Sequence, residues 1–310
     1  MKQIFYIASC TEDGGIYRID ENDIIAKYPC DRPMYMIKSG DKLHAVLREM
    51  FSDGSSGVVS FEIDGNGDLI NMTEAESTNG VCGCHLCESD GEIYVVNYLS
   101  GNVTRVPDVT VTHTGCGINK KRQDVAHTHY VCESPDGKYV FVTDLGVDKI
   151  FVYDKELNEV SNVDMPSGHG PRHLVFYDET TVFCVNELMS TVSVLGYADG
   201  KLVLKDTFNA LPEDYEGESI AAAIRCIGNT VYVSNRGHDS VSVMEYDGEA
   251  LKLVKTVSSY GNGPRDIWVT DNVVVCTNEK SNNVTFVSLS TGELLSEIQI
   301  DSPIAVIPNE

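Results

Sequence analysis

Five stretches of this sequence share one pattern, an apolar run that ends on Asn or Asp: Ile93-Tyr-Val-Val-Asn97, Val140-Phe-Val-Thr-Asp144, Val182-Phe-Cys-Val-Asn186, Val231-Tyr-Val-Ser-Asn235 and Val273-Val-Val-Cys-Thr-Asn278. The copies recur at intervals of 42 to 49 residues. A turn and a further apolar run follow each copy, such as Ile150-Phe-Val-Tyr153 after the second. Short runs rich in Val, Ile, Thr and Tyr, separated by Gly, Asp and Asn, are typical of β-strands.

Two looser copies precede these five, from Ile4 to Ile19 and from Pro33 to Ile63. Seven units of about 40–50 residues match the period of β-propeller blades. We therefore predict an all-β fold, a seven-bladed β-propeller with four-stranded blades that forms a single domain over residues 1–310. The first unit lacks an innermost strand, so Ser302-Pro-Ile-Ala-Val-Ile307 is expected to join it and close the ring. A two-sheet β-sandwich is the alternative, but a sandwich does not need this period.

The composition limits the partners and the compartment. The chain has 310 residues and a formal net charge of −24, from 23 Lys and Arg and 47 Asp and Glu. So acidic a protein repels phosphate groups, which argues against nucleic acid or an anionic membrane surface as a partner. Only one Lys and a few apolar residues precede Cys10, too few for a signal peptide. Ten cysteines without an export signal indicate reduced thiols, so we expect a cytoplasmic location.

The predicted topology indicates where a site would form. In each blade the innermost strand leads away from one face and the second strand returns to it, so the start of one and the end of the other share a channel mouth. Aligning the copies places five positions at one level of the channel: Cys84, His129, Arg172, Ala222 and Arg265. Glu187 and Arg236 follow the ends of second strands at the same mouth. These positions differ between blades, which favours a site over a purely structural repeat.

Structural interpretations of the same residues stay open. His127 and His129 lie on one strand face and could form a metal pair, but no third ligand is compelling, and they could equally be hydrogen-bonded core residues. Arg172 and Arg265 could bond backbone carbonyls of neighbouring blades. The cluster Cys82-x-Cys84-His85-x-Cys87 has the residue types of a metal site, but strand alternation divides its cysteines between two faces. We expect no metal and no other cofactor.

Several segments resemble, in order and spacing, the seven-bladed propeller lactonase family: His127-Thr-His-Tyr130, Gly170-Pro-Arg-His-Leu-Val-Phe176, Val185-Asn-Glu-Leu188, Val233-Ser-Asn-Arg-Gly-His-Asp-Ser240 and Gly263-Pro-Arg-Asp266. That family includes propeller-type 6-phosphogluconolactonases and fungal carboxymuconate-lactonizing enzymes. The resemblance implies a catalytic set made of His127 or His129 together with Arg172, Glu187 and Arg236. One departure stands out, because Ala223 occupies a position that is often acidic in the family, which puts the specific family activity in question.

Three further positions at the predicted mouth are expected to contact substrate: His173, Arg265 and Asp144. Together these observations predict a lactone hydrolase resembling 6-phosphogluconolactonase, acting on a small-molecule lactone or sugar acid. Glu187 or a His would activate water, and Arg172 and Arg236 would hold the oxyanion or an anionic group of the substrate. No Gly-x-Ser-x-Gly nucleophile signature is present, so attack by water is preferred. The alternatives are a carboxymuconate-type lactonizing cycloisomerase and a non-catalytic binding platform. The sequence leaves the oligomeric state open.

Overall fold

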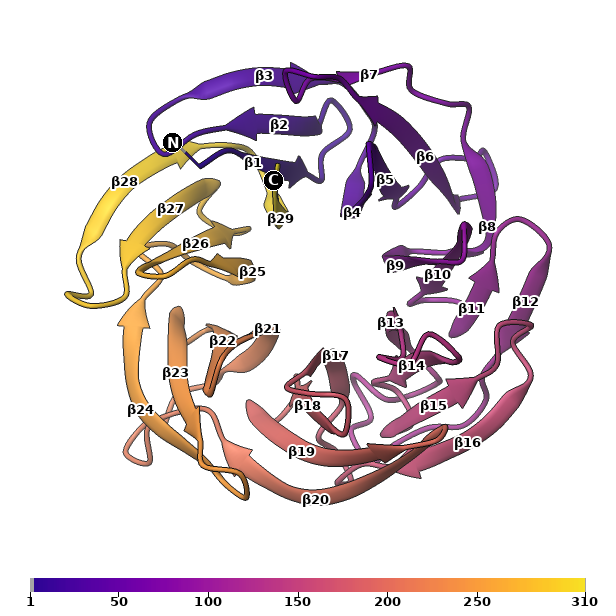
Figure 1. The fold of residues 1–310 in the computed structure, drawn as a ribbon, viewed down its shortest axis with the longest axis vertical. Helices are drawn as coiled ribbons and strands as arrows, with labels where there is room; N and C mark the ends of the chain where they lie inside the picture. The colour runs from indigo at the N-terminus through magenta and orange to yellow at the C-terminus, as the bar shows by residue number, and fades with distance from the viewer. Residues whose placement is uncertain (1–2, 310) are drawn as a thin grey trace.

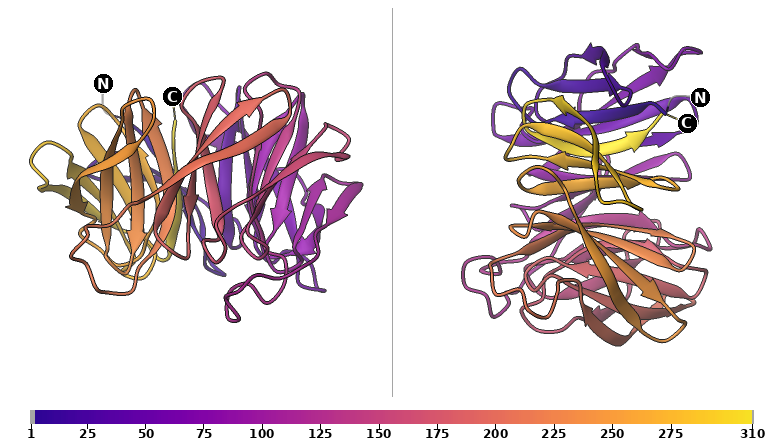
Figure 2. Two further views of the ribbon diagram at one scale, coloured as in Figure 1. Left: turned by 90° about the horizontal axis from the view of Figure 1, so that it is seen from below. Right: turned by 90° about the vertical axis from the view of Figure 1, so that its left-hand side faces the viewer.

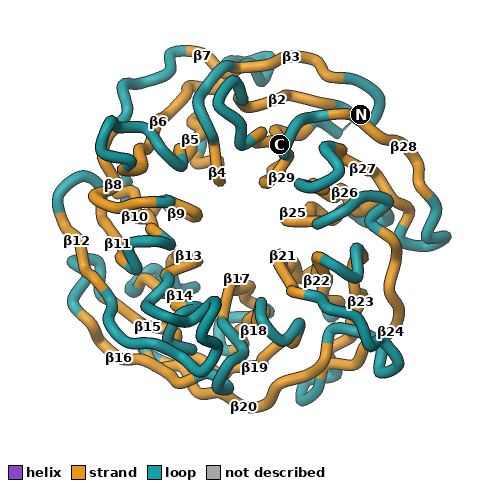
Figure 3. The backbone as a smooth tube through the Cα atoms, turned by 180° about the vertical axis from the view of Figure 1, so that it is seen from behind, coloured by secondary structure: helices purple, strands orange, loops and turns teal. Residues whose placement is uncertain are grey.

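The computed structural model describes residues 3–309, in which all regular structure is β-strand. Seven sheets surround a central channel (Figure 1). The view from behind shows the same ring of strands joined by loops (Figure 3). Side views show that the strands run roughly across the thickness of the ring (Figure 2). The predicted seven-bladed propeller is confirmed. The described residues contain no helix long and apolar enough to cross a membrane.

Each blade is an antiparallel sheet whose innermost strand faces the channel. The innermost strands are β4 (Pro33–Ser39), β9 (Gly83–Ser89), β13 (Thr128–Glu133), β17 (Pro171–Phe176), β21 (Ile220–Ile227), β25 (Pro264–Val269) and β29 (Pro303–Pro308). The second strands are β1 (Phe5–Ser9), β5 (Lys42–Leu47), β10 (Glu92–Asn97), β14 (Val140–Asp144), β18 (Thr181–Asn186), β22 (Thr230–Arg236) and β26 (Val273–Asn278).

The outer half of each blade is also regular. The third strands are β2 (Gly15–Ile19), β6 (Ser55–Ile63), β11 (Asn102–Arg105), β15 (Lys149–Tyr153), β19 (Thr191–Ala198), β23 (Ser240–Tyr246) and β27 (Asn283–Ser288). The outermost strands are β3 (Ile24–Tyr28), β12 (Val109–Thr112), β16 (Glu159–Asp164), β20 (Lys201–Asn209), β24 (Leu251–Ser258) and β28 (Leu294–Gln299). In the second blade two short strands, β7 (Leu69–Ile70) and β8 (Glu76–Val81), both pair with β6.

The C-terminal strand closes the ring, as the sequence predicts. Strand β29 pairs antiparallel with β1, with Ile7 opposite Val306, so the two ends of the chain share one blade (Figure 1). Closure removes the exposed strand edge that an open ring would present.

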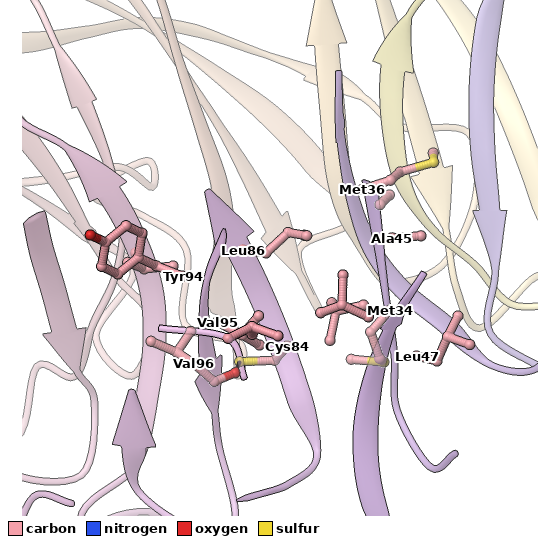
Figure 4. Close-up of a cluster of buried hydrophobic side chains, with 14 of the residues drawn as sticks. Met34, Met36, Ala45, Leu47, Cys84, Leu86, Tyr94, Val95 and Val96 are labelled. Atoms are coloured by element: carbon pink, nitrogen blue, oxygen red, sulfur yellow. Dashed lines mark hydrogen bonds between the residues drawn. The ribbon is translucent and has the colours of Figure 1, made fainter. Parts of the chain in front are cut away.

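The hydrophobic core lies between neighbouring blades. Every residue of β14 and β18 is buried, because both faces of these strands pack against other sheets. Figure 4 shows one such contact, where Met34 and Leu47 of the second blade approach Cys84 and Val96 of the third. Burial on both faces explains why the second strands read as continuous apolar runs.

The repeated Asn at the end of the second strand has a structural role, as Asn186 and Asn278 show. Asn186 donates hydrogen bonds to Thr191 Oγ1 at 3.0 Å and Ser193 Oγ at 2.8 Å, both on the third strand. Asn278 likewise donates to Thr285 Oγ1 at 3.1 Å and to the carbonyl of Ser259 at 3.3 Å. The side chain therefore ties the second strand to the rest of its blade.

Replacing Asn278 by Ala should lower the free energy of unfolding by about 1–2 kcal/mol, because it removes two buried hydrogen bonds. Chemical denaturation followed by circular dichroism measures this change. The matched control is Asn262→Ala on the exposed loop before β25, which should change stability by less than about 0.5 kcal/mol. Equal effects of the two substitutions would contradict the assigned role.

Candidate active site

A β-bulge near the start of each inner strand places its side chains at one level of the channel. In six blades the pairing between the inner and second strands skips one residue: Met34, Cys84, His129, Arg172, Arg265 and Ile304. In the blade of β21 the register shift spans Ala222 and Ala223. Bulges redirect side chains next to functional sites. The level that the aligned repeats predict therefore exists, and the bulge is its physical cause.

The Gly-Pro-Arg segments deliver two of these side chains. Gly170 and Gly263 have positive φ angles of 65° and 70°, which a residue with a side chain adopts only with strain. Their backbone N–H groups donate to Asp148 Oδ1 and Asp239 Oδ1 of the preceding blade, each at 2.8 Å. The locked turn leads directly into the bulge that carries Arg172 or Arg265.

A cavity of about 240 Å³, which we name the proximal cavity, lies at one channel mouth; Arg265 lines it, whereas Arg172 lies deeper, beside the narrow middle of the channel. Its lining residues are Met34, Arg48, Cys82, Cys84, Tyr98, Arg122, His129, Glu187, Arg236 and Arg265. Four guanidinium groups and a single carboxylate stand in this lining. The proximal cavity is thus locally cationic within a protein of net charge −24.

Glu187 is the centre of the charged cluster, and its side chain is only 2% exposed. Its Oε2 accepts hydrogen bonds from Arg172 Nε at 2.9 Å and forms an ion pair with Arg236 Nη2 at 2.8 Å, while Oε1 accepts from Arg122 Nη2 at 2.5 Å. Burial alone would raise the pKa of Glu187, but the guanidinium groups outweigh it and hold the pKa well below 4.5. The carboxylate is therefore ionised at neutral pH.

The structure separates the two histidines that the sequence leaves as alternatives. His129 lines the proximal cavity, and its Nε2 lies 3.9 Å from Glu187 Oε2. Burial and the charge of Arg172 lower its pKa well below 6.5, so the ring is neutral at pH 7. Its Nδ1 has no hydrogen-bond partner among residues 3–309.

His127 lies outside the proximal cavity. Its ring stacks on Tyr98 at 4.4 Å, its Nδ1 donates to the Tyr98 carbonyl at 2.9 Å, and its Nε2 lies 3.2 Å from Asp124 Oδ1. These contacts fix Tyr98, whose hydroxyl accepts from Arg122 at 3.3 Å. His127 is therefore placed to act through Tyr98 rather than on a ligand.

The three expected substrate contacts occupy different places. Arg265 lines the proximal cavity and pairs with Glu279 at 3.2 Å. His173 lies deeper, in the narrow middle of the channel, where its Nε2 is 3.0 Å from Arg172 Nη1. Asp144 lies outside the cavity lining, at the structural Asn position. It accepts hydrogen bonds from His113 Nδ1 and from the backbone N–H groups of His127 and Gly146.

Two arginines of the cavity escaped the sequence analysis. Arg122 belongs to the connection between β12 and β13, outside the repeat, although the run Lys120-Lys-Arg122 is conspicuous in so acidic a chain. Arg48 directly follows the second strand of its blade, as Glu187 follows β18. Arg236 is the last residue of β22, the second strand of its own blade. Aligning the loosely matching second unit with the others would have indicated Arg48.

The structure also shows where Ala223 and the cysteine cluster lie. Ala223 is fully buried, and its backbone N–H donates to Ser234 Oγ. Cys82 and Cys84 line the proximal cavity, whereas Cys87 lies toward the other end of the channel. Within residues 3–309, no group of three or more His, Cys, Asp or Glu side chains is arranged to hold a metal ion.

The fold and the site together define a propeller of the lactonase type. The sequence matches the family described as "Lactonase, 7-bladed beta-propeller" over residues 5–308. The chain therefore belongs to this lactonase family. An uncharacterized protein of Staphylococcus aureus strain N315 is 31% identical, over 93% of this chain and 94% of its own length.

Solved structures share the whole fold. A protein from Lactobacillus plantarum superposes with a TM-score of 0.89 at 28% identity, over 100% of both chains. A putative 6-phosphogluconolactonase from Bacteroides fragilis has a TM-score of 0.86 at 23% identity, over 99% of this chain and 98% of its own. A periplasmic gluconolactonase from Pseudomonas aeruginosa gives 0.86 at 23% identity, over 99% of both chains. At 23% identity these last two comparisons show a shared fold and nothing about the activity.

Replacing Glu187 by Gln should lower the free energy of unfolding at pH 7 by about 3–5 kcal/mol, because buried guanidinium groups lose their counter-charge. The folded-state pKa of Glu187 is depressed, so its ionised form stabilises the fold above pH 4.5. That contribution is lost as the pH falls through the folded-state pKa. The difference between wild type and variant should therefore be full at pH 7 and shrink in strong acid.

The control is Glu279→Gln, which removes the partly exposed partner of Arg265 and should cost less than about 1 kcal/mol. Denaturant unfolding of the three proteins across pH measures both effects. A Glu187→Gln variant as stable as the control at pH 7 would contradict the assignment of Glu187 as the counter-charge of this cluster.

Proposed function

We propose that this protein hydrolyses a sugar lactone that carries an anionic group, a phosphate or a carboxylate, in the proximal cavity. Membership of the lactonase family supports the reaction class. The observation that carries the proposal is the cluster itself, in which an ionised carboxylate, three guanidinium groups and a neutral imidazole meet at a cavity. The similar folds include proteins described as a putative 6-phosphogluconolactonase and a periplasmic gluconolactonase, one named for a phosphorylated lactone and one for an uncharged lactone, so the charge of the substrate is argued from the cavity.

The charge of the cavity favours an anionic substrate. Glu187 neutralises part of the guanidinium charge, and Glu279 pairs with Arg265, but no carboxylate among residues 3–309 forms an ion pair with Arg48. Arginine binds phosphate and carboxylate groups through two parallel hydrogen bonds. Within a Debye length of about 8 Å this local charge outweighs the repulsion that the acidic surface exerts on an anion.

His129 is better suited than Glu187 to accept a proton. Guanidinium groups already engage both oxygens of the Glu187 carboxylate, which leaves it poorly placed to take a proton from water. His129 lines the cavity and is neutral at pH 7, and its Nε2 lies 3.9 Å from the Glu187 carboxylate, which stabilises the imidazolium once it forms. Glu187 then positions His129 and the arginines instead of taking the proton.

The reaction proceeds in two steps. Water attacks the lactone carbonyl carbon while His129 takes one of its protons, and the guanidinium groups stabilise the negative charge on the carbonyl oxygen. The tetrahedral intermediate then collapses, the ring C–O bond breaks, and His129 returns the proton to the leaving alkoxide. The product is the open hydroxy acid, and no serine ester forms.

Replacing His129 by Gln should lower kcat for 6-phosphogluconolactone by about 10²–10⁴-fold, the range for loss of a general base. Stopped-flow detection of acid release measures this. In the wild type kcat/KM should remain level from pH 7 to below 6.5 and fall at lower pH, as His129 becomes protonated. The control His44→Gln, on β5 outside the cavity, should retain wild-type rates. Wild-type rates in His129→Gln would remove this residue from the mechanism.

Replacing Arg48 by Met should raise KM for 6-phosphogluconolactone at least about tenfold while leaving KM for uncharged gluconolactone within twofold, because one charge-assisted contact is lost. Arg32→Met, which removes a partly exposed ion pair with Asp31 outside the cavity lining, serves as control. Parallel assays with a carboxymuconate substrate test the lactonizing alternative. A wild-type enzyme that prefers the uncharged lactone would overturn the anionic assignment.

A further inference from the structure

A second and larger cavity opens at the opposite end of the channel. We name it the distal cavity. It measures about 620 Å³ and is lined by the far ends of the inner strands, among them Tyr35, His85, Tyr130, Leu174, Arg225 and Trp268. Between the two cavities the channel narrows to a space of about 10 Å³ beside Arg172, His173 and Asp266. The proximal and distal linings have no residue in common, so the distal cavity is a separate site.

The walls of the distal cavity suit an aromatic body. The His85 ring lies 4.1 Å from the Tyr35 ring and 4.0 Å from the Tyr130 ring, which makes a continuous aromatic wall. Burial and the charges of Arg225 and Arg172 lower the pKa of His85 well below 6.5, so this wall carries no charge at pH 7. Ligand cavities of this size, with apolar walls and few polar groups, are typical of small-molecule sites.

The charged side chains that line the distal cavity are cations. Lys38 and Arg225 line it, and its lining contains no Asp or Glu, although the chain has 47 of them. Lys38 donates to the Asn309 carbonyl at 2.7 Å and has no ion-pair partner among the described residues. A carboxylate ligand could pair with this ammonium group.

Arg225 is held in place beside this opening. Its Nη2 donates to Asp266 Oδ1 at 2.7 Å and its Nη1 to the Ile224 carbonyl at 2.9 Å. Its Nε has no partner within residues 3–309, and the guanidinium lies 5.6 Å from the centre of the Trp268 ring. Asp266 also accepts the backbone N–H groups of Ile267 and Val306, so its oxygens are engaged within the protein. The ion pair with Asp266 therefore fixes the guanidinium at the wall of the distal cavity and offsets part of its charge.

We propose that the distal cavity binds a small aromatic carboxylate. The aromatic body packs against the rings of Tyr35, His85 and Tyr130, and the carboxylate lies near Arg225 and Lys38. Aromatic stacking and a charge-assisted contact supply the two parts of the affinity. This site goes beyond lactone hydrolysis and does not depend on it, because none of its residues lines the proximal cavity.

Trp268 provides a direct signal, since it is the single tryptophan of the chain and it lines the distal cavity. Titration with 3-phenylpropionate should change its fluorescence saturably, and calorimetry should give the same Kd. The amide 3-phenylpropionamide, which has the same body without charge, should bind at least about tenfold more weakly. Inorganic phosphate, an anion without an aromatic group, should leave the fluorescence of Trp268 unchanged. No saturable signal with the acid at millimolar concentration, or equal affinities for acid and amide, would overturn the proposal.

Two variants test the residues. Lys38→Met should weaken binding of 3-phenylpropionate several-fold, and the double variant Arg225→Gln, Asp266→Asn should weaken it at least about tenfold without leaving a buried carboxylate unpaired. Lys42→Met, exposed on β5, is the matched control, and Arg48→Met checks independence from the proximal cavity. Both should bind as wild type. Thermal unfolding verifies the fold of each variant. If the double variant does not fold, Lys38→Met and the acid-to-amide comparison still decide. Equal binding of acid and amide, or unchanged affinity in Lys38→Met, would refute the site.

Discussion

The ion pairs of one buried carboxylate hold the functional end of this propeller together. Glu187 follows β18, Arg172 lies on β17, Arg236 ends β22 and Arg122 comes from the connection before β13, so the cluster joins three blades. Like charges this close repel one another unless an opposite charge lies between them. Burial and Arg236 lower the pKa of Arg172 to about 9, which still leaves it charged at neutral pH. The cationic cavity therefore depends on the Glu187 carboxylate staying ionised.

The repeat explains how one backbone supports two cavities with different linings. A bulge at the same place in the inner strands presents Met34, Cys84, His129, Arg172 or Arg265 at one level. The backbone at these positions is equivalent, so each blade can change its side chain without disturbing the sheet. Farther along the same strands the alternation continues, and the side chains there form the aromatic and aliphatic walls of the distal cavity. Variation between blades at fixed positions is what makes a symmetric scaffold carry an asymmetric site.

The sequence predicted the fold because packing between blades forces a period on the second strands, and it predicted the level of His129, Arg172 and Arg265 because the bulge recurs with that period. Other features lie outside periodicity. Arg122 reaches the site from a connection that only one blade has. The choice between His127 and His129 depends on the bulge, which reverses strand alternation at that point. Asp144 drew attention as a carboxylate at the mouth, yet it fills the position where other blades use Asn for internal hydrogen bonds.

The side chains at the centre of the channel separate the two cavities, and one of them, His173, contacts residues on both sides. His173 contacts Arg172 of the proximal cluster through its Nε2 at 3.0 Å, and its ring lies 4.8 Å from that of Tyr130, which lines the distal cavity. Burial and the neighbouring Arg172 lower the pKa of His173 well below 6.5, so this central ring stays neutral. Packed side chains around His173 leave a space of only about 10 Å³ between the cationic cavity and the aromatic one. Each mouth can therefore hold its own electrostatic character within a chain of net charge −24.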